Sequence, residues 1–263
     1  MSMTETYTTP PVEVTAPALV PYPFGLFSVA PAATPTDDRW TNGVWWSSVG
    51  CNVAGVTFDP CNVDDPVPEK SANVLCNIVD AAVGFTVYAR SDLSVGGRPL
   101  AERFDQARTT LLGGEQYAAE AGLWNALVGA TTSVATVETV NEAVAIAEAR
   151  IAAAYGGTPV IHIGRYGAIL AHDVLSAAGT RLTTMLGSSV VAGGGYAPTA
   201  PDAGESFDVI ATGALVVLRG IVNDLGEHID RDTNSVSAVA ERAYAIGWDC
   251  AAVRVTVTPP TPE

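Results

Sequence analysis

Residues 100–128 read LAERFDQARTTLLGGEQYAAEAGLWNALV, and this stretch sets the architecture of the chain. Its apolar residues recur at three- and four-residue intervals, which predicts a single helix about 45 Å long. Pro99 suits the first turn of such a helix. Gly113-Gly114 each cost about 1 kcal/mol relative to alanine inside a helix, so we expect a kink or break there. The apolar stripe comprises Leu100, Phe104, Ala107, Leu111, Ala118, Ala121 and Leu127, with Trp124 beside it.

Shorter elements follow this helix. Residues 137–154 carry a helical apolar stripe, with Thr139 and Glu142 at capping-box spacing and Gly156-Gly157 as a stop. A third helix is expected over 166–176, closed near Gly179, and an acidic loop over 223–234. Strands are predicted at 85–90, 160–163, 189–192, 207–211, 215–222, 241–248 and 252–257. Helices and strands that do not alternate regularly indicate the α+β class.

The first 38 residues hold seven prolines with little periodicity, which predicts an extended arm without its own core. The arm nevertheless carries apolar residues, so we expect it to lie on its own domain or on a neighbouring subunit. These residues are Val20, Tyr22, Phe24, Leu26 and Phe27.

Residues 40–93 have β character. Trp40, Val44, Trp45 and Trp46 form an aromatic run, and Cys51–Lys70 is a Gly/Pro/Asp-rich excursion. Long loops of this kind are uncommon in compact domains and usually have a function.

The composition excludes several functional classes. The 263 residues carry a formal charge of −15, opposite to the basic footprint of a protein that binds nucleic acid or an anionic membrane. Only 16% of residues are charged while 48% are hydrophobic, so we expect much of the surface to be covered by other chains. The start has the pattern of neither a signal peptide nor a membrane span. We therefore expect a protein made in a cytosol, with Cys51, Cys61, Cys76 and Cys250 as free thiols.

The titratable residues form no catalytic or metal-binding pattern. His162, on an apolar strand, and His172 are interpreted as structural, and the cysteines fit no zinc module. Glu115 and Glu120 are interpreted as solvated helix positions. Gly193-Gly194-Gly195 lacks the order of a dinucleotide-binding loop. We expect no enzymatic activity, no cofactor and no metal.

The order of these elements resembles that of the major capsid proteins of tailed bacteriophages that infect actinobacteria. These proteins share the Hong Kong ninety-seven (Johnson) fold with encapsulin nanocompartments. Each matching stretch is weak alone, and the order carries the resemblance. The stretches are YPFGLFSV (22–29), FTVYAR (85–90), LTTMLGSSVVAGGGY (182–196), IATGALVVLR (210–219) and ERAYAIGWDC (241–250).

The resemblance implies a layout. Residues 1–40 would be the N-arm, 41–84 the E-loop region, and 85–135 a P-domain strand with the long spine helix. Residues 136–235 would be mostly the A-domain, and 236–263 the C-terminal P-domain strands and tail.

The implied function is self-assembly of hexamers and pentamers into an icosahedral shell around double-stranded DNA, without sequence-specific binding. The protein would be assembled in the host cytoplasm and reside in the virion. Its main partner would be itself, with scaffold, portal and decoration proteins as further partners and no membrane. The subunit-interface candidates are Tyr22, Phe24, Phe27, Trp45, Trp46 and Lys70. Some relatives crosslink an E-loop lysine, but for Lys70 a solvated charge is the preferred interpretation.

Three other functions remain open at this point. An encapsulin shell would share the fold, although the arm argues against it. A minor virion protein would form rings, tubes or surface knobs. A cytosolic enzyme or ligand-binding protein would use the loop 193–204, but the chain lacks the clusters that such a site needs.

Overall fold

The computed structural model describes residue 17 and residues 19–51, 79–94, 100–198, 204–230 and 235–260. Four helices and one 3-10 helix lie in these ranges: α1 (Leu26–Val29), η1 (Asp38–Asn42), α2 (Leu100–Ala130), α3 (Val140–Ala154) and α4 (Arg165–Leu170). The strands are β1 (Val44–Ser47), β2 (Val79–Ala82), β3 (Gly84–Ser94), β4 (Ser133–Val137), β5 (Val160–Gly164), β6 (Leu175–Ala178), β7 (Arg181–Thr184), β8 (Ser189–Gly193), β9 (Phe207–Thr212), β10 (Leu215–Asp230), β11 (Ser235–Trp248) and β12 (Ala252–Val257). The α+β class is confirmed.

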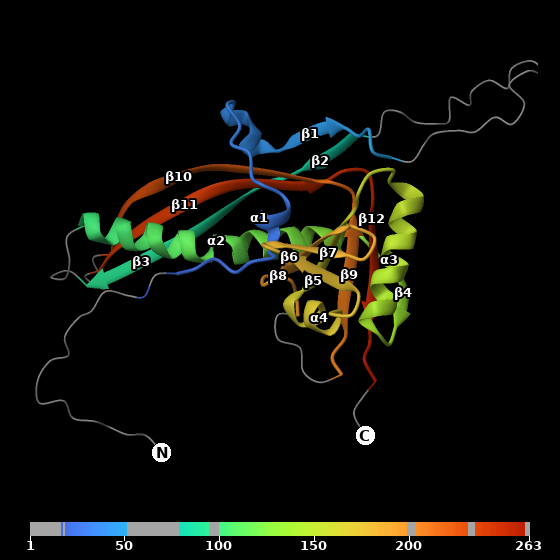
Figure 1. The fold of residues 1–263 in the computed structure, drawn as a ribbon. Helices are drawn as coiled ribbons and strands as arrows, with labels where there is room; N and C mark the ends of the chain where they lie inside the picture. Colours follow the sequence, from blue (N-terminus) through green and yellow to red (C-terminus); the bar gives the residue numbers. More distant parts are fainter. Residues whose placement is uncertain are drawn as a thin grey trace, which may run out of the picture.

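Helix α2 runs along an antiparallel sheet of order β10-β11-β3 (Figure 1). In this sheet Tyr244 stands opposite both Phe85 and Arg219, so one strand register aligns residues from three distant segments. The apolar side of α2 and the facing side of the sheet form one core. It includes Val87, Ala107, Leu111, Leu123, Leu127, Ala240 and Tyr244, all less than 9% exposed.

A second, seven-stranded sheet has the order β4-β12-β9-β5-β8-β7-β6. Its central strand β5 is buried on both faces, which explains why the strand is apolar apart from His162. Ile161 and Ile163 belong to the core that includes α3, whereas Val160 belongs to the core that includes α2. The long helix is therefore shared between the two sheets.

A short ribbon, β1-β2, lies beside β11 (Figure 1). Its strands pair antiparallel, with Trp46 opposite Asp80. Trp46 and Ala82 face Gly247 of β11 so closely that a Cβ there would lie 2.8 Å and 2.9 Å from their side chains. A glycine at this point lets the ribbon dock flat on the strand.

Helix α2 continues through Gly113-Gly114, so the expectation of a break there is wrong. Nearby residues of the helix, Ala107, Leu111, Ala119 and Leu123, are at most 1% exposed in the core. Burial of side chains of this kind contributes about 1.5–3 kcal/mol for each large one, which exceeds the glycine cost. Tertiary packing therefore overrides local propensity here.

Two other expectations are also wrong. The third helix ends at Leu170, and residues 175–184 form the hairpin β6-β7, which turns at Gly179 with φ +61°. The acidic stretch 223–230 is the far half of strand β10, paired with β11 across a register shift between Leu225 and His228. Strand β10 is an edge strand of its sheet, and charged residues are accommodated at such edges.

The cysteine prediction is wrong for two of the four residues. Cys51 and Cys250 form a disulfide, with Cα atoms 5.3 Å apart although the two residues are 199 positions apart in sequence. Sequence spacing could not reveal it, because the fold alone brings these residues together. Cys61 and Cys76 lie outside the described residues. None of the helices in the described ranges is long and apolar enough to cross a membrane.

Replacement of Gly114 by alanine is expected to stabilise the chain by about 0.5–1 kcal/mol, because alanine loses less backbone entropy in a helix. The position is exposed, and an added Cβ would meet no atom within 4 Å. Chemical denaturation measures the effect.

Gly167→Ala is the matched control, since its Cβ would lie 2.8 Å from the Ile163 and Phe207 side chains, and it should destabilise. Lower stability of G114A would show that α2 is distorted at this point.

Candidate functional site

The arm residues predicted to contact a subunit lie on their own chain. Phe27 stacks on Tyr244 with ring centroids 6.1 Å apart, and Leu26 is fully buried in the α2 core. Phe24 is half-buried with φ +66°, and its carbonyl accepts a hydrogen bond from the Ala192 amide of β8. Residues 22–30 of the arm therefore pack on their own chain, against α2 and both sheets.

The arm is held by Glu120 of α2, whose side chain is fully buried. Its Oε1 accepts a hydrogen bond from the Leu26 amide (2.9 Å), and its Oε2 accepts from the Tyr22 hydroxyl (2.6 Å) and the Gly195 amide (3.1 Å). One carboxylate therefore joins the arm, the helix and the turn after β8. The expectation that Glu120 is solvated is wrong.

The backbone of the arm and the turn after β8 both approach α2 so closely that glycine is needed at the points of contact. A Cβ on Gly195 would lie 2.2 Å from the Tyr117 carbonyl oxygen and 2.7 Å from the Ala121 amide nitrogen. A Cβ on Gly25 would lie 2.7 Å from Oε1 of Glu120. Within the cluster 193–195, Gly195 thus allows close packing on the helix, whereas Gly193 and Gly194 make room for the Tyr196 and Tyr22 side chains.

Burial raises the pKa of the Glu120 carboxyl, and the hydrogen bonds from Tyr22, Leu26 and Gly195 partly offset the rise. Burial together with the neighbouring carboxylate also raises the pKa of the Tyr22 hydroxyl, which therefore stays protonated as the donor. The Arg165 guanidinium lies over the Tyr22 ring, 4.9 Å from the ring centroid, as a cation–π contact.

Glu115 lies one and a half turns earlier on α2 and is also buried, again against expectation. It forms ion pairs with Arg219 of β10 and with Arg242 of β11, the latter at 2.7 Å. Tyr244 donates to the same carboxylate at 2.9 Å, and burial followed by the Glu115 charge raises the pKa of Tyr244 to about 12. Glu115 therefore joins α2 to the three-stranded sheet.

His162 is a structural residue, as expected. Its Nδ1 lies 2.8 Å from the Tyr196 hydroxyl and its Nε2 lies 3.0 Å from Oγ1 of Thr212. Since the Thr212 hydroxyl donates to the Gly213 carbonyl, Nε2 carries the proton and Nδ1 accepts from Tyr196. Burial lowers the pKa of His162 to about 3, so the ring is neutral and satisfied.

The ribbon presents one predicted tryptophan to solvent and buries the other in part. Trp45 is 73% exposed, whereas Trp46 is half-buried and donates from Nε1 to Oδ1 of Asp249 at 3.3 Å. Of the five tryptophans, Trp45 is the most exposed. Lys70 lies outside the described residues.

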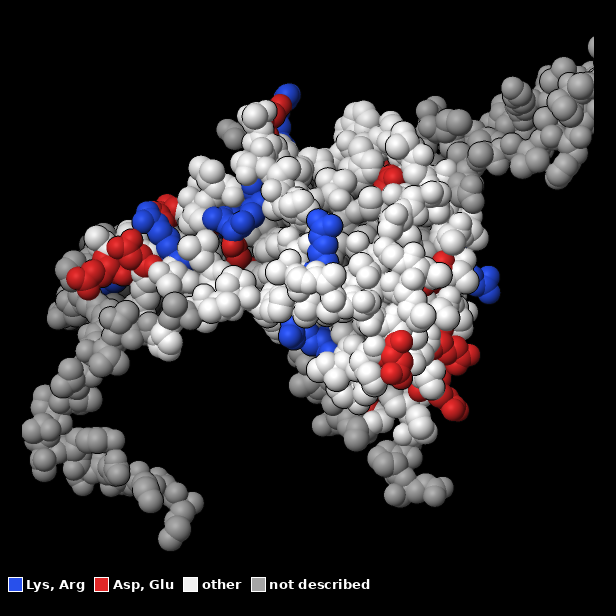
Figure 2. All heavy atoms as spheres, viewed as in Figure 1, with Lys and Arg blue, Asp and Glu red and all other residues white. Residues whose placement is uncertain are grey.

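The described surface carries isolated charges and many apolar side chains. Figure 2 shows acidic residues gathered over the start of α2 and near α3, with wide uncharged areas between them. The most exposed large apolar residues are Val20, Trp45, Val49, Val83, Ile169, Met185, Leu186 and Ile221, each at least 70% exposed. A hollow of about 560 Å³ lies between residues 33–45 and Leu218. In the described ranges no three His, Cys, Asp or Glu residues are placed to hold a metal ion.

Glu120→Gln is expected to lower the free energy of unfolding by about 1–3 kcal/mol, because an amide offers one acceptor oxygen where the carboxylate offers two. At least one of the Leu26 and Gly195 amides would lose its acceptor. Urea denaturation measures the change. Glu138→Gln, at an exposed position, is the matched control and should have almost no effect. Equal stability of E120Q and E138Q would contradict the role given to Glu120.

No model of a known protein family matches this chain, and no curated protein matches its sequence. Solved structures do match. A chain from the capsid of a native GTA particle has a TM-score of 0.54 at 10% identity, covering 95% of each chain. A chain of the mature capsid of bacteriophage PhiM1 has a TM-score of 0.49 at 12% identity, covering 98% of this chain and 93% of that one. A chain from Mycobacterium phage Cain has a TM-score of 0.48 at 14% identity, covering 94% and 93%. The match at 0.54 spans nearly the full length, and this chain has the Hong Kong ninety-seven-like (Johnson) fold.

Proposed function

We propose that this chain is the major capsid protein of a tailed bacteriophage. Its copies assemble into an icosahedral shell that encloses double-stranded DNA, and its role is structural rather than enzymatic. The observation that carries the proposal is the match over 95% of the chain to a capsid subunit with the same fold. The low charge content and the exposed apolar residues support it, because such surfaces favour large contacts between subunits.

We place residues 1–40 in the N-arm, 41–84 in the E-loop region, and 85–135 in a P-domain built on the spine helix α2. Residues 136–235 are mostly the A-domain and 236–263 the C-terminal P-domain segment. The pairing of β11 with β3 supports the return of the chain to the P-domain after the A-domain. Because β10 pairs with β11, we also assign residues 215–230 to the P-domain.

The negative charge of the chain is compatible with a shell that encloses DNA without binding it tightly. A formal charge of −15 repels packaged DNA, so the shell encloses the genome without binding its sequence. Assembly takes place in the host cytoplasm, and the finished protein belongs to the virion. Scaffold, portal and decoration proteins are its further partners, and the sequence resemblance favours an actinobacterial host.

Trp45 and Trp46 are the interface candidates that the structure makes most testable. Trp45 projects from the ribbon and is 73% exposed, so it is available to a neighbouring copy, whereas Trp46 is half-buried already. Tyr22, Phe24 and Phe27 support the interface from within, because they fix the arm on α2 and the two sheets. Lys70 remains a candidate in the E-loop region.

Purified full-length chain, examined by size-exclusion chromatography and negative-stain microscopy, is expected to form closed shells or capsomer rings. The diameter of the shells separates a phage head from a smaller encapsulin compartment. Tubes or knobs would indicate a minor virion protein. A plain monomer that binds a small ligand, shown by a ligand-induced rise in melting temperature, would contradict the proposal.

Assembly is further expected to shift the tryptophan fluorescence to shorter wavelength, because Trp45 leaves water. A Trp45→Phe variant provides the control, since the phenyl ring still fills an apolar contact but contributes no indole emission. The shift should be present in wild-type particles and much reduced in W45F particles. An equal fluorescence shift in wild-type and W45F particles would show that Trp45 does not lie in the subunit interface.

A further inference from the structure

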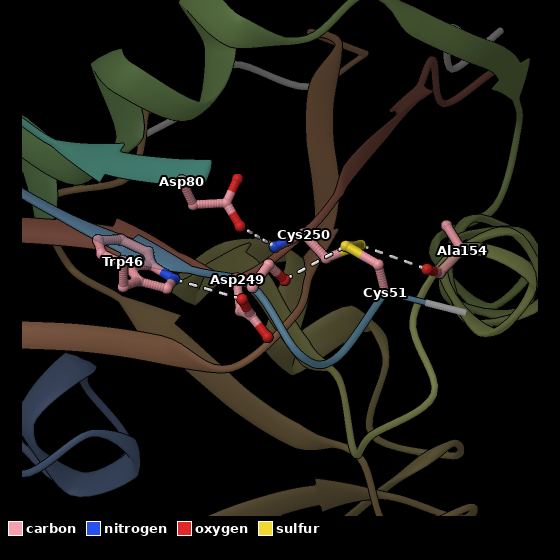
Figure 3. The surroundings of a disulfide bond; sticks show 7 residues. Trp46, Cys51, Asp80, Ala154, Asp249 and Cys250 are labelled. Atoms are coloured by element: carbon pink, nitrogen blue, oxygen red, sulfur yellow. Dashed lines mark hydrogen bonds between the residues drawn. A yellow bond between two sulfur atoms is a disulfide. The ribbon is translucent and has the colours of Figure 1, made fainter. Parts of the chain in front are cut away.

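The disulfide lies at the point where the ribbon meets the turn between β11 and β12 (Figure 3). Cys51 follows β1, and Cys250 lies two residues after Trp248, with φ +67°. An isolated β-bridge also pairs Cys51 with Tyr155, the C-cap of α3. Three separate elements therefore meet at this bond.

Contacts that do not involve sulfur hold the same arrangement. The Cys250 amide donates to Oδ2 of Asp80 in β2 at 2.6 Å, and Trp46 of β1 donates to Asp249 at 3.3 Å. The Gly156 amide donates to the Gly50 carbonyl at 2.8 Å. Both strands of the ribbon are thus docked by hydrogen bonds that do not involve the sulfur atoms.

Each sulfur has a polar neighbour that a thiol could use. Oγ of Ser48 lies 3.2 Å from Sγ of Cys51, and the Ala154 carbonyl oxygen lies 3.4 Å from Sγ of Cys250 (Figure 3). A reduced Cys250 would donate its S–H to that carbonyl, so reduction leaves no buried donor without an acceptor. Both cysteines are half-buried, which leaves them within reach of small solutes.

We propose that Cys51 and Cys250 form a reversible redox staple: the chain folds with both thiols reduced, and oxidation then locks the docked ribbon without rearranging it. The oxidant is a low-molecular-weight disulfide. One protein thiolate attacks it and expels one small thiol, and the second protein thiolate then attacks the mixed disulfide and expels the other. Two protein thiols and one small disulfide become one protein disulfide and two small thiols, so atoms and electrons balance.

The staple changes how long the ribbon stays docked rather than where it docks. The bond connects residues 199 positions apart, and closing so long a loop restricts the unfolded chain strongly. The bond lies next to the ribbon, whose strands β1 and β2 precede and follow residues 52–78 in the sequence. Cytosolic thiols are kept reduced. Under the proposed function, on which only this timing rests, the bond would close after the particle leaves the cell.

The test uses full-length chain carrying Cys61→Ser and Cys76→Ser, so that only Cys51 and Cys250 can react. The chain is fully reduced, then exposed to oxidised glutathione, and thiols are counted by alkylation and mass spectrometry. We expect a monomeric product that has lost both thiols, an unchanged far-ultraviolet circular dichroism spectrum and a melting temperature several degrees higher. Hydrogen exchange of residues 44–47 and 79–82 should slow on oxidation.

Persistent mixed disulfides, an intermolecular bond, an unfolded reduced chain, or unchanged exchange in the ribbon would each overturn the proposal. The same chain carrying Cys250→Ser as well is the control, and its exchange should not respond to glutathione. If the serine background does not fold, non-reducing peptide mapping of the wild-type chain replaces it, with a Cys51–Cys250 peptide as the expected product. All measurements use unassembled chain, so a failure to form shells does not affect them.

Discussion

A single buried carboxylate determines how the segments of this protein meet. Glu120 sits on the long helix and accepts hydrogen bonds from the arm at Tyr22 and Leu26 and from the turn after β8 at Gly195. A buried charge is tolerated only where donors surround it, and here the donors come from segments up to 98 residues away in sequence. The need to satisfy Glu120 therefore fixes the arm and the seven-stranded sheet on the same helix.

Glu115 has the same effect on the other sheet. By pairing with Arg219 and Arg242, Glu115 connects β10 and β11 to α2. Glu115 therefore contacts the three-stranded sheet, and Glu120 contacts the turn that follows β8 of the seven-stranded sheet. The centre of the molecule thus holds buried ion pairs and hydrogen bonds, whereas exposed apolar side chains such as Trp45 and Met185 lie at its surface. The disulfide adds a covalent tie at the third junction, between the ribbon and the β11-β12 turn.

The sequence predicts much of this fold because, in several elements, the local sequence pattern agrees with the structure that forms. Strand β12 and helix α3 appear nearly at their predicted ends, and the Thr139 side chain does accept from the Glu142 amide at the start of α3. The family resemblance rests on the order of elements, which survives where sequence identity is 10%.

Other features depend on contacts that periodicity does not report. Glu115 and Glu120 look solvated in sequence, because the partners that bury them are distant arginines and backbone amides. Gly113-Gly114 look like a break, because the packing that overrides them is tertiary. The Cys51–Cys250 pair is set by the meeting of β1 with the β11-β12 turn. A glutamate among alanines and glycines on a long helix, as in residues 113–122, is the one local signal that the face around Glu120 is closely packed.

Native-state hydrogen exchange of the Leu26 and Gly195 amides tests the role of Glu120 most directly. These amides lie on the arm and on the β8 turn, 169 residues apart, yet both donate to one carboxylate. We predict that both exchange slowly in the wild-type chain and that both become fast in E120Q, while the amides of α3 keep their protection. If either amide keeps its wild-type protection in E120Q, or if α3 loses protection equally, Glu120 is not the residue on which these junctions depend.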